Sequence, residues 1–476
     1  MSARVGGNAP NGRVLVIGLA KTGEETTAVL RREGVEVTVV EERPTGPEYQ
    51  VRADVARASG ASVLDGAPVG GWDGFVGAFT LIVPSPGVQP DHPALVAARA
   101  HGVPIRSEIE LAAERIVAPI VAVTGTNGKT TVTALIAAML DASGRHAIAA
   151  GNIGTPLIRF AGSGPATGVD VVVAEVSSFQ LEFTARFHPR VAVVLAIADD
   201  HLDWHGSFRS YANAKAKVFA AQQPDDVLVY DGDDPIASSL TATAASRRIA
   251  VSLDPDREDA ARVVDGRLLD PAGEVLADVS SLTRALPHDR SNALAASCAA
   301  LAAGATRSGI RAALAGFRTL PHRVALVGEA RGVKYYDDSK ATNPHAAVHA
   351  ISGFDSVVLL AGGRNKDLDL GVLAADVDRI RAVVAFGEAA RDVEKAFAGK
   401  RPVVRAESMR DVVRAGAEQA RSGDVVLLSP ACASWDWYAG GYEARGDDFA
   451  SEVAQLIAET AERSERAAGD DDRGVR

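Results

Sequence analysis

One short segment between residues 124 and 131 constrains the fold of this chain more than any other feature. An apolar, β-branched run at 119–124 leads into Gly125-Thr126-Asn127-Gly128-Lys129-Thr130-Thr131, and an Ala- and Leu-rich stretch follows to about Ala142. This order predicts a strand, a loop and a helix, which together surround an anion with backbone N–H groups and a helix N-terminus. We therefore expect a parallel-sheet α/β domain whose loop binds the phosphates of a nucleotide.

The residue types in this loop suit a nucleotide triphosphate and its metal. Glycines let the backbone wrap closely around phosphate oxygens, Lys129 can reach the β- and γ-phosphates, and the Thr130 hydroxyl can ligate Mg²⁺. The spacing departs from the commonest phosphate-loop pattern, because Val123 stands where that pattern has its first glycine. A chance glycine-rich turn is the alternative, and the strand–loop–helix order favours nucleotide binding over it. The loop alone does not distinguish an ATPase from a kinase or a ligase.

Short β-branched runs alternate with helical stretches along the whole chain, a pattern typical of parallel-sheet domains. The 476 residues exceed what one hydrophobic core usually supports, and we divide them into three α/β blocks. These are a Rossmann-like N-terminal domain at 1–114, a central P-loop mononucleotide-binding domain at 115–319 and a Rossmann-like C-terminal domain at 320–462. Within the central block we expect a hairpin with strands at 263–269 and 274–276. The charged tail at 463–476 is expected to be disordered.

Composition and charge argue against several classes of protein. The net charge of −11 disfavours a nucleic-acid partner. The two cysteines, Cys298 and Cys432, lie far apart without metal-ligand spacing, which suits a reducing compartment. No apolar run is long enough for a membrane-spanning helix, and the first residues do not look like a signal peptide. We expect a cytoplasmic monomer without membrane insertion.

Candidate metal ligands follow the strands of the central block. Glu175 stands at the end of a predicted strand, and a carboxylate is the kind of hard oxygen ligand that Mg²⁺ prefers. The next strand ends in the acidic loop 199–203, which includes His201. A structural glutamate and a solvated acidic turn are the alternative interpretations. Lys215 and Lys217 follow on a predicted helix, where exposed lysines usually serve solvation.

Together these motifs resemble the Mur ligase and folylpolyglutamate synthase superfamily. Its members carry a nucleotide loop similar to 124–131, phosphorylate a carboxylate with ATP and couple it to an amine. Lys215 falls where Mur ligases carry a lysine that CO₂ converts to a carbamate. The resemblance implies ATP and two Mg²⁺ ions, with metal contacts from Thr130, Glu175, His201 and carbamylated Lys215. It implies catalytic roles for Lys129, His201 and Lys215.

Five further segments resemble the family members that join D-glutamate to UDP-N-acetylmuramoyl-L-alanine. They are residues 151–154, 177–182, 320–323, 338–344 and 428–434, so the resemblance covers nearly the whole chain. The Asp-Asn-Pro-Arg motif expected of diaminopimelate- or lysine-adding members is absent. The resemblance therefore implies these two small molecules as substrates, joined through an acyl phosphate in cytoplasmic peptidoglycan precursor synthesis.

The resemblance also implies ligand contacts residue by residue. For ATP they are Gly125, Thr126, Asn127, Gly128, Lys129, Thr130, Thr131, Asn292, Arg323 and Asp338. For D-glutamate they are Lys340, Thr342, Lys366, Ser434 and Tyr442. The sequence departs from the family pattern at Asp289, where many relatives have a second asparagine, and by one extra residue before Tyr442. On physical grounds, Thr342 or Asn343 can cap a helix that begins at Pro344, which favours an anion at that point.

The N-terminal block by itself approximates a dinucleotide-binding fingerprint. Residues 18–23 and Glu41 have about the right spacing, but Ala20 replaces the middle glycine that lets a pyrophosphate approach. The family resemblance assigns this block to the UDP moiety instead, and Glu42 departs from the threonine expected near uracil. The implied UDP contacts are Ala20, Lys21, Thr22, Arg43, Ser85, Gly87 and Asn152. An NAD-dependent oxidoreductase, a nucleotide-driven switch protein and a sister ligase stay open as alternatives.

Overall fold

The computed structural model of the chain describes residues 12–318 and 320–471, with side chains up to residue 462. It comprises two compact units. The first unit contains the described residues up to Ile197, then Trp204–Thr283 and Arg290–Phe317. The second contains Ala198–Asp203, Arg284–Asp289 and the described residues from Arg318 onward. Three separate sheets correspond to the three predicted blocks and confirm the three-domain α/β fold.

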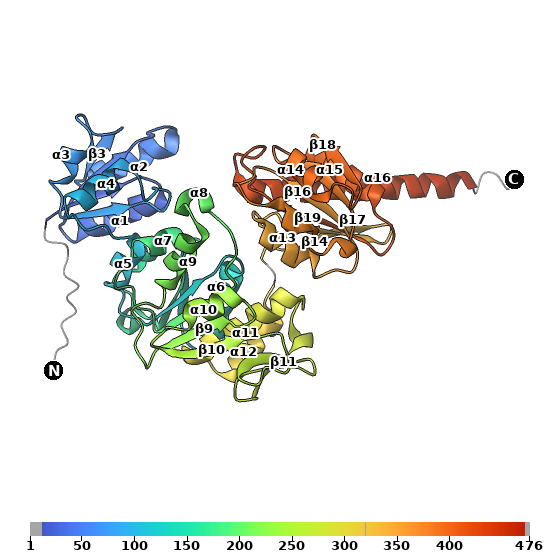
Figure 1. The fold of residues 1–476 in the computed structure, drawn as a ribbon, viewed down its shortest axis with the longest axis horizontal. Helices are drawn as coiled ribbons and strands as arrows, with labels where there is room; N and C mark the ends of the chain where they lie inside the picture. Colours follow the sequence, from blue (N-terminus) through green and yellow to red (C-terminus); the bar gives the residue numbers. More distant parts are fainter. Residues whose placement is uncertain (1–11, 319, 472–476) are drawn as a thin grey trace. The chain divides into compact units, whose positions relative to one another are not determined.

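The N-terminal sheet, in the first unit, is four-stranded and parallel (blue in Figure 1). Its strands, in the order β3-β2-β1-β4, are β1 (Arg13–Ile17), β2 (Glu36–Glu41), β3 (Ser62–Asp65) and β4 (Leu81–Pro84). Its helices are α1 (Lys21–Arg32), α2 (Pro47–Ala58), α3 (Trp72–Val76) and α4 (Pro93–Ala100), and α5 (Glu108–Ala113) leads into the central block. Since the strands are parallel, the loops after β1, β2 and β4 leave from one edge, where ligands of such sheets bind.

The central sheet, also in the first unit, has nine strands in the order β13-β12-β11-β10-β9-β8-β5-β7-β6. The strands are β5 (Ile120–Thr124), β6 (Ala147–Gly151), β7 (Val171–Glu175), β8 (Val191–Val194), β9 (Val227–Asp231), β10 (Arg247–Val251), β11 (Ala260–Val264), β12 (Arg267–Leu269) and β13 (Val275–Asp278). The helices are α6 (Lys129–Asp141), α7 (Ser178–Glu182), α8 (Leu202–His205), α9 (Phe208–Ala216), α10 (Pro235–Thr241), α11 (Pro287–Ala302) and α12 (Arg307–Gly316), with short 3₁₀ turns at Leu157–Phe160, Pro165–Thr167 and Val279–Ser281.

Strand β5 is buried on both faces and holds the phosphate loop at its carboxyl end. It pairs in parallel with β7 on one side and β8 on the other. Val121 and Val123 enter one hydrophobic core, whereas Ile120 and Ala122 enter the other. Because both neighbours are parallel, Glu175 at the end of β7 lies beside the start of the loop.

The predicted hairpin is wrong in one respect. The segment 263–269 is not one strand, because β11 ends at Val264 and β12 begins at Arg267 in the antiparallel direction. Asp265 and Gly266 between them have φ of 47° and 71°. Asp-Gly with two positive φ angles is the favoured two-residue hairpin turn, so this signal was present in the sequence. The turn at 270–273 then leads into β13, as predicted.

The C-terminal sheet, in the second unit, has the order β14-β15-β19-β16-β17-β18, with only β14 antiparallel. Its strands are β14 (Ala325–Ala330), β15 (Val333–Asp337), β16 (Val357–Gly362), β17 (Ile380–Phe386), β18 (Val403–Ala406) and β19 (Val425–Ala431). Its helices are α13 (Pro344–Ile351), α14 (Ala390–Phe397), α15 (Met409–Gln419) and α16 (Gly441–Asp471), with 3₁₀ turns at Leu370–Ala374 and Val377–Arg379. Val357 and Leu359 enter the core on one face, and Val358 and Leu360 enter the core on the other.

Helix α16 continues past residue 462 into the segment that we expected to be disordered, and it ends at Asp471 (red in Figure 1). The segment lacks an apolar stripe but contains Ala, Glu and Arg, which have high helix propensity. Extension of an existing helix also avoids the cost of a new nucleus. Residues 472–476 of the predicted tail lie outside the described residues.

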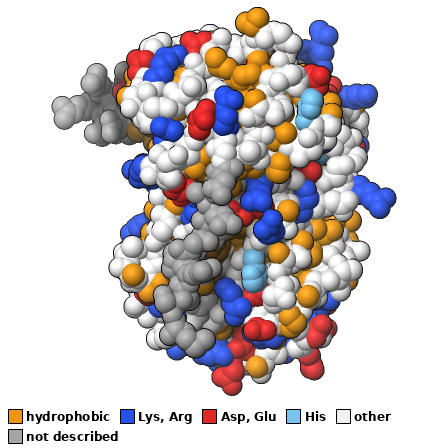
Figure 2. Space-filling view, turned by 90° about the vertical axis from the view of Figure 1, so that its left-hand side faces the viewer, with side chains coloured by type: hydrophobic (Ala, Val, Ile, Leu, Met, Phe, Trp, Pro, Cys, Tyr) orange, Lys and Arg blue, Asp and Glu red, His pale blue; other side chains and the backbone are white. Residues whose placement is uncertain are grey.

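The described helices include none that is both long enough and apolar enough to cross a membrane. On the face shown in Figure 2, acidic and basic side chains are scattered among apolar ones.

Candidate active site

The phosphate loop between β5 and α6 requires glycine at two positions. Gly125 has φ of 146°, and a Cβ there would lie 2.6 Å from the Cβ of Leu195. Gly128 precedes α6 with φ of 79°, and a Cβ there would lie 2.5 Å from Oδ1 of Asn292. The left-handed backbone and these close neighbours hold the loop open at the helix N-terminus. Asn292, a predicted ATP contact, thus lies against the loop.

Two lysines converge on this loop. Lys129 Nζ donates to the carbonyls of Gly125 at 3.0 Å and Thr126 at 2.9 Å. Lys215 is 2% exposed, and its Nζ donates to the same Gly125 oxygen at 2.7 Å. Its Nζ also lies 4.6 Å from the ring centre of Tyr211, whose hydroxyl is 2.9 Å from Oγ1 of Thr126. Two ammonium groups therefore share one carbonyl oxygen, an arrangement that favours an anion beside them.

Glu175 presents a buried carboxylate at the end of β7. It is 2% exposed, and its Oε1 accepts a hydrogen bond from Asn152 Nδ2 at 2.8 Å. Its Oε2 is buried and has no hydrogen-bond partner among the described residues. A buried carboxylate oxygen without a partner is costly unless a cation binds it. Glu175 therefore fits a Mg²⁺ ligand.

The described residues contain no cluster of three or more His, Cys, Asp and Glu side chains that could hold a metal. Mg²⁺ in nucleotide sites commonly uses one or two protein groups together with phosphate oxygens and water. Glu175 and the Thr130 hydroxyl would meet that number in the first unit, and both assignments stay predictions. His201, which we also predicted as a ligand, belongs to the second unit. Its grouping with Glu175 and Lys215 stays a prediction.

Asp338 and Asn343 lie after β15 in the second unit. Asp338 is 7% exposed and accepts a hydrogen bond from Ser429 Oγ at 2.8 Å. Burial raises the pKa of Asp338 to about 7, against the opposing effects of Ser429, Arg323 and Arg284. Asn343 caps α13 by accepting from Ala346 N at 2.8 Å, with Pro344 next, which confirms one of the two predicted caps. Loops at the carboxyl end of this parallel sheet thus carry both polar residues.

Lys366, a predicted D-glutamate contact, binds a carboxylate of the chain itself. Its Nζ lies 2.5 Å from Oδ1 of Asp200, and Asp200 Oδ2 accepts from Asn343 Nδ2 at 3.2 Å. No local pattern in the sequence pairs Asp200 with a lysine 166 positions away. Lys366 is therefore paired with a carboxylate of a neighbouring loop of the second unit, and its role as a D-glutamate contact stays a prediction.

The other predicted D-glutamate contacts lie on neighbouring loops. Lys340 Nζ is 3.8 Å from the ring centre of Tyr442, so these two side chains are together. Ser434 is 2% exposed and follows β19, while Thr342 is half-buried just before α13. Four of the five predicted residues therefore lie on loops of the second unit, and Tyr442 lies in the first turn of α16.

Except for Asn152, which follows β6 of the central sheet, the predicted UDP contacts lie at the carboxyl edge of the N-terminal sheet, on its loops or in the first turn of α1. Ser85 Oγ donates to the Gly18 carbonyl at 3.2 Å, which joins the loops after β1 and β4. Lys21 Nζ donates to the carbonyl of Gly154, next to the segment that contains Asn152. Glu41 accepts from the Leu19 backbone N–H at 2.8 Å, so this acid closes the loop after β1. Asn152 itself is bonded to Glu175.

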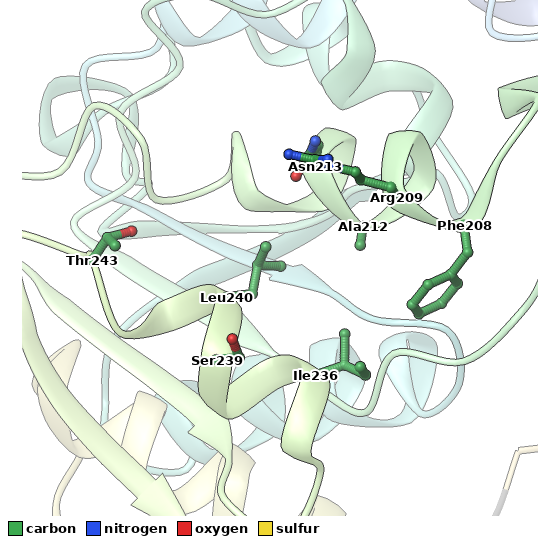
Figure 3. A pocket seen from close by; sticks show the side chains of 8 residues that line it. All are labelled: Phe208, Arg209, Ala212, Asn213, Ile236, Ser239, Leu240 and Thr243. Carbon is green, nitrogen blue, oxygen red and sulfur yellow. The ribbon is translucent and has the colours of Figure 1, made fainter.

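A cavity of about 410 Å³ lies between α9 and α10, outside this set of residues (Figure 3). It is lined by Phe208, Arg209, Ala212, Asn213, Ile236, Ser239, Leu240 and Thr243. Its lining includes no residue of the phosphate loop, and neither Glu175 nor Lys215.

Three regions of the chain match known protein families. Residues 12–107 match the Mur ligase MurD-like N-terminal domain, 123–300 the Mur ligase middle domain and 322–432 the Mur ligase glutamate ligase domain. Similar proteins include two named UDP-N-acetylmuramoylalanine--D-glutamate ligase. That of Frankia casuarinae is 43% identical over 92% of this chain and 93% of its own length. That of Desulfosudis oleivorans is 42% identical over 94% of this chain and 97% of its own.

Solved structures with the same fold come from more distant ligases. UDP-N-acetylmuramate-alanine ligase from Thermotoga maritima is 18% identical with a TM-score of 0.54, covering 93% of this chain and 99% of that chain. MurF from Acinetobacter baumannii is 18% identical with a TM-score of 0.55, covering 88% of this chain and 90% of that chain. At this identity the likeness shows the fold.

Replacement of Glu175 by Gln tests whether its unpartnered oxygen serves a cation. Gln keeps an acceptor for Asn152 but removes the charge. We expect the unliganded variant to unfold at the same or a higher temperature, because a buried charge is lost. We expect Mg²⁺-dependent ATP turnover to fall by about a hundredfold, because charge stabilisation in the site is lost. Glu182→Gln, at a partly exposed glutamate nearby, is the control, and a destabilised variant with normal Mg²⁺ dependence would contradict the metal role.

The raised pKa of Asp338 predicts a pH-dependent effect on stability. The folded protein holds this proton up to about pH 7, whereas an unfolded aspartate releases it near pH 4. The proton on Asp338 therefore contributes fully to the free energy of unfolding at low pH, and this contribution is lost as the pH rises toward 7. Asp338→Asn removes the titration, so its free energy of unfolding relative to wild type should increase by roughly 1–3 kcal/mol from about pH 5 to pH 8. Urea unfolding at several pH values measures this difference, and a difference independent of pH would rule out the raised pKa.

Proposed function

This chain belongs to the Mur ligase family, and we propose that it joins D-glutamate to UDP-N-acetylmuramoyl-L-alanine in an ATP-dependent reaction. The observation that carries the reaction type is the convergence of Lys129 and Lys215 on the Gly125 carbonyl of the phosphate loop. The shared name of the near full-length relatives supports the two substrates. The amide would be formed in the cytoplasmic steps of peptidoglycan precursor synthesis.

The reaction must make a carboxylate reactive toward an amine. Hydroxide is a poor leaving group, so the L-alanine carboxylate of the UDP substrate first takes the γ-phosphoryl group of ATP and releases ADP. The D-glutamate amine then attacks this acyl phosphate, the C–N bond forms, and inorganic phosphate leaves with the amine losing a proton. Neither step needs a covalent bond to the protein. Catalysis therefore depends on position and on stabilisation of charge.

The first unit supplies the nucleotide end of this reaction. Backbone N–H groups of 125–131 surround the phosphates, Lys129 neutralises charge on the transferred group, and Asn292 lies on the adenine side. Mg²⁺, when bound, neutralises phosphate charge and orients the γ-phosphoryl group. Glu175 and Thr130 are its proposed ligands in the first unit, and His201 is a further proposed ligand. Arg323 and Asp338 complete the ATP contacts.

Lys215 is proposed to act as a carbamate. In the structure its ammonium and that of Lys129 share the Gly125 oxygen, so two cations lie close together in a buried place. The Lys215 ammonium would lose one proton, its neutral amine would then form an N–C bond to CO₂ and lose a second proton, and the resulting carbamate anion would keep an N–H for the Gly125 carbonyl. The carbamate oxygens would then help to hold the Mg²⁺ ions of the site, of which two are proposed.

The amino-acid end lies in the second unit. Lys366 binds the Asp200 carboxylate in the structure, and we assign to it a carboxylate of D-glutamate. Ser434 and Thr342 offer hydroxyl groups on the adjacent loops, and Lys340 with Tyr442 forms a second cationic position. D-Glutamate carries two carboxylates, which matches two separate lysines.

The UDP end is assigned to the edge of the N-terminal sheet. Ala20, Ser85 and Gly87 lie on the loops after β1 and β4, and Lys21 and Thr22 begin α1, near the proposed diphosphate. Arg43 follows β2 on the uracil side, and Asn152 lies next to Glu175 in the direction of the reaction centre.

Phosphate release tests the proposed substrates. With ATP, Mg²⁺ and UDP-N-acetylmuramoyl-L-alanine present, release should require D-glutamate and should fall at least about tenfold with L-glutamate, L-lysine or meso-diaminopimelate. A site built around fixed charges rejects analogues whose charged groups are misplaced. A rate of phosphate release that does not depend on the amino acid would indicate a switch protein or a simple ATPase. A preference for another amino acid would indicate a sister ligase.

Chemical rescue tests the carbamate. Lys215→Ala should lose about a hundredfold in turnover, because an anion beside the metal end is removed. Added acetate or bicarbonate should restore part of the activity, since a small carboxylate can occupy the vacated space. Lys217→Ala is the matched control, because Lys217 lies two positions away and binds Glu182 at the partly exposed side. An active Lys215→Ala variant would remove Lys215 from the mechanism.

A further inference from the structure

Three loops of the second unit meet at one buried side chain. The loops are 338–343 after β15, 363–366 after β16 and 431–434 after β19. Strand β19 pairs in parallel with both β15 and β16, so all three loops leave from the same edge of the sheet. The side chain at their junction is Arg445, from the first turns of α16, and it is 1% exposed.

Arg445 contacts each of the three loops. Its Nε donates to Ser339 Oγ at 2.9 Å, and its Nη2 donates to the Ser339 carbonyl at 2.8 Å. Its Nη1 donates to the Cys432 carbonyl at 3.1 Å. A Cβ added at Gly363 would lie 3.0 Å from the same Nη1, so the third loop packs against the guanidinium. One planar group therefore holds two loops by hydrogen bonds and limits how closely the third can approach.

Direct contacts between the loops complete this junction. Ala431 N donates to the Ala341 carbonyl at 2.9 Å. Arg364 and Ala433 exchange two backbone hydrogen bonds at 2.8 and 2.9 Å. Ser339 Oγ donates to the Tyr442 carbonyl at 2.8 Å, which ties the first loop to the start of α16. The loops are thus in fixed register, and the Arg445 side chain lies against all three.

The chemistry of Arg445 favours a positioning role over a contribution to the hydrophobic core. Its hydrogen-bond acceptors are two carbonyls and a hydroxyl, with no carboxylate among them. Burial lowers its pKa to about 10, so it stays protonated at neutral pH. A buried cation of this kind usually stabilises a fold less than an apolar side chain of similar volume would. A rigid fork of donors, by contrast, fixes the geometry of several acceptors at once.

We propose that Arg445 is a positioning residue for the amino-acid substrate, which sets the register of the three loops that carry Lys340, Thr342, Lys366 and Ser434. This inference rests on the proposed function, because those four residues are the proposed D-glutamate contacts. Arg445 acts through the loops and does not touch the substrate.

Arg445→Lys is the central test, with steady-state kinetics and amide hydrogen exchange on the full-length protein. Lysine keeps the charge but cannot present a planar fork, so the KM for D-glutamate should rise by about tenfold or more. The KM for UDP-N-acetylmuramoyl-L-alanine should change less than about twofold, because its proposed site is on the N-terminal sheet. Exchange should increase in residues 338–343 and 431–434.

Ser339→Ala removes one acceptor of the same junction and serves where Arg445→Lys does not fold. It should raise the KM for D-glutamate in the same direction by a smaller factor. The double variant should show less than the product of the two single effects, because both act on one contact. Arg414→Lys is the matched control, since Arg414 pairs with Glu459 on the exposed side of α16 and should leave both KM values unchanged.

Two results would overturn the proposal. One is a folded Arg445→Lys or Ser339→Ala protein with unchanged KM for D-glutamate and lower kcat only in proportion to its active fraction. The other is unchanged hydrogen exchange in the three loops. Wild-type protein that does not use D-glutamate would contradict the proposed function instead, and the exchange measurement would still decide whether Arg445 holds the loops.

Discussion

The carbonyl oxygen of Gly125 is the acceptor on which the nucleotide end of the site depends. It accepts hydrogen bonds from both Lys129 and Lys215, which come from different helices. It can do so because Gly125 has a φ of 146° that turns the backbone close to Leu195, where a Cβ would collide. Leu195 follows β8, so the pairing of β8 with β5 determines where both lysines can reach. A feature of the sheet thus fixes where the two ammonium groups lie beside the phosphate loop.

The same geometry organises the second unit. Parallel strands end at one edge, and the loops that follow them bring together residues that are far apart in the sequence. Lys366, Ser434 and Asn343 follow three different strands in this way. The central strands of this sheet are buried on both faces. Polar side chains that bind a ligand are therefore found on the loops at the edge of the sheet and not within these strands. This explains why the predicted D-glutamate contacts follow the strands of this sheet and why its apolar strand runs contain none of them.

Much of the fold followed from local patterns in the sequence. The phosphate loop, most strand positions and the Asn343–Pro344 helix start were predictable, because each depends on a few consecutive residues. The Asp265–Gly266 turn was equally local and was missed when 263–269 was taken as one strand. The Asp200–Lys366 pair and the Arg445 junction had no such signal, because they join residues brought together only by the sheet. Residue types suggested chemistry at Glu175 and Lys215, but only the structure revealed the unpartnered oxygen and the shared carbonyl.

Several non-glycine residues of the second unit have strained backbone conformations that depend on their neighbours. Among the described residues, the non-glycine positions with positive φ include His322, Val324 and Ala431, with φ of 58°, 49° and 63°. Val324 is β-branched, for which such a conformation is unusual, and each case costs on the order of 1–3 kcal/mol. Such conformations persist only when their surroundings leave no alternative. Here a Cβ at Gly446 would collide with His322, and Ala431 immediately precedes the Cys432 carbonyl that Arg445 holds. The start of α16 therefore supplies the constraint that keeps the strained loops beside Arg323 and Ser434 in one conformation.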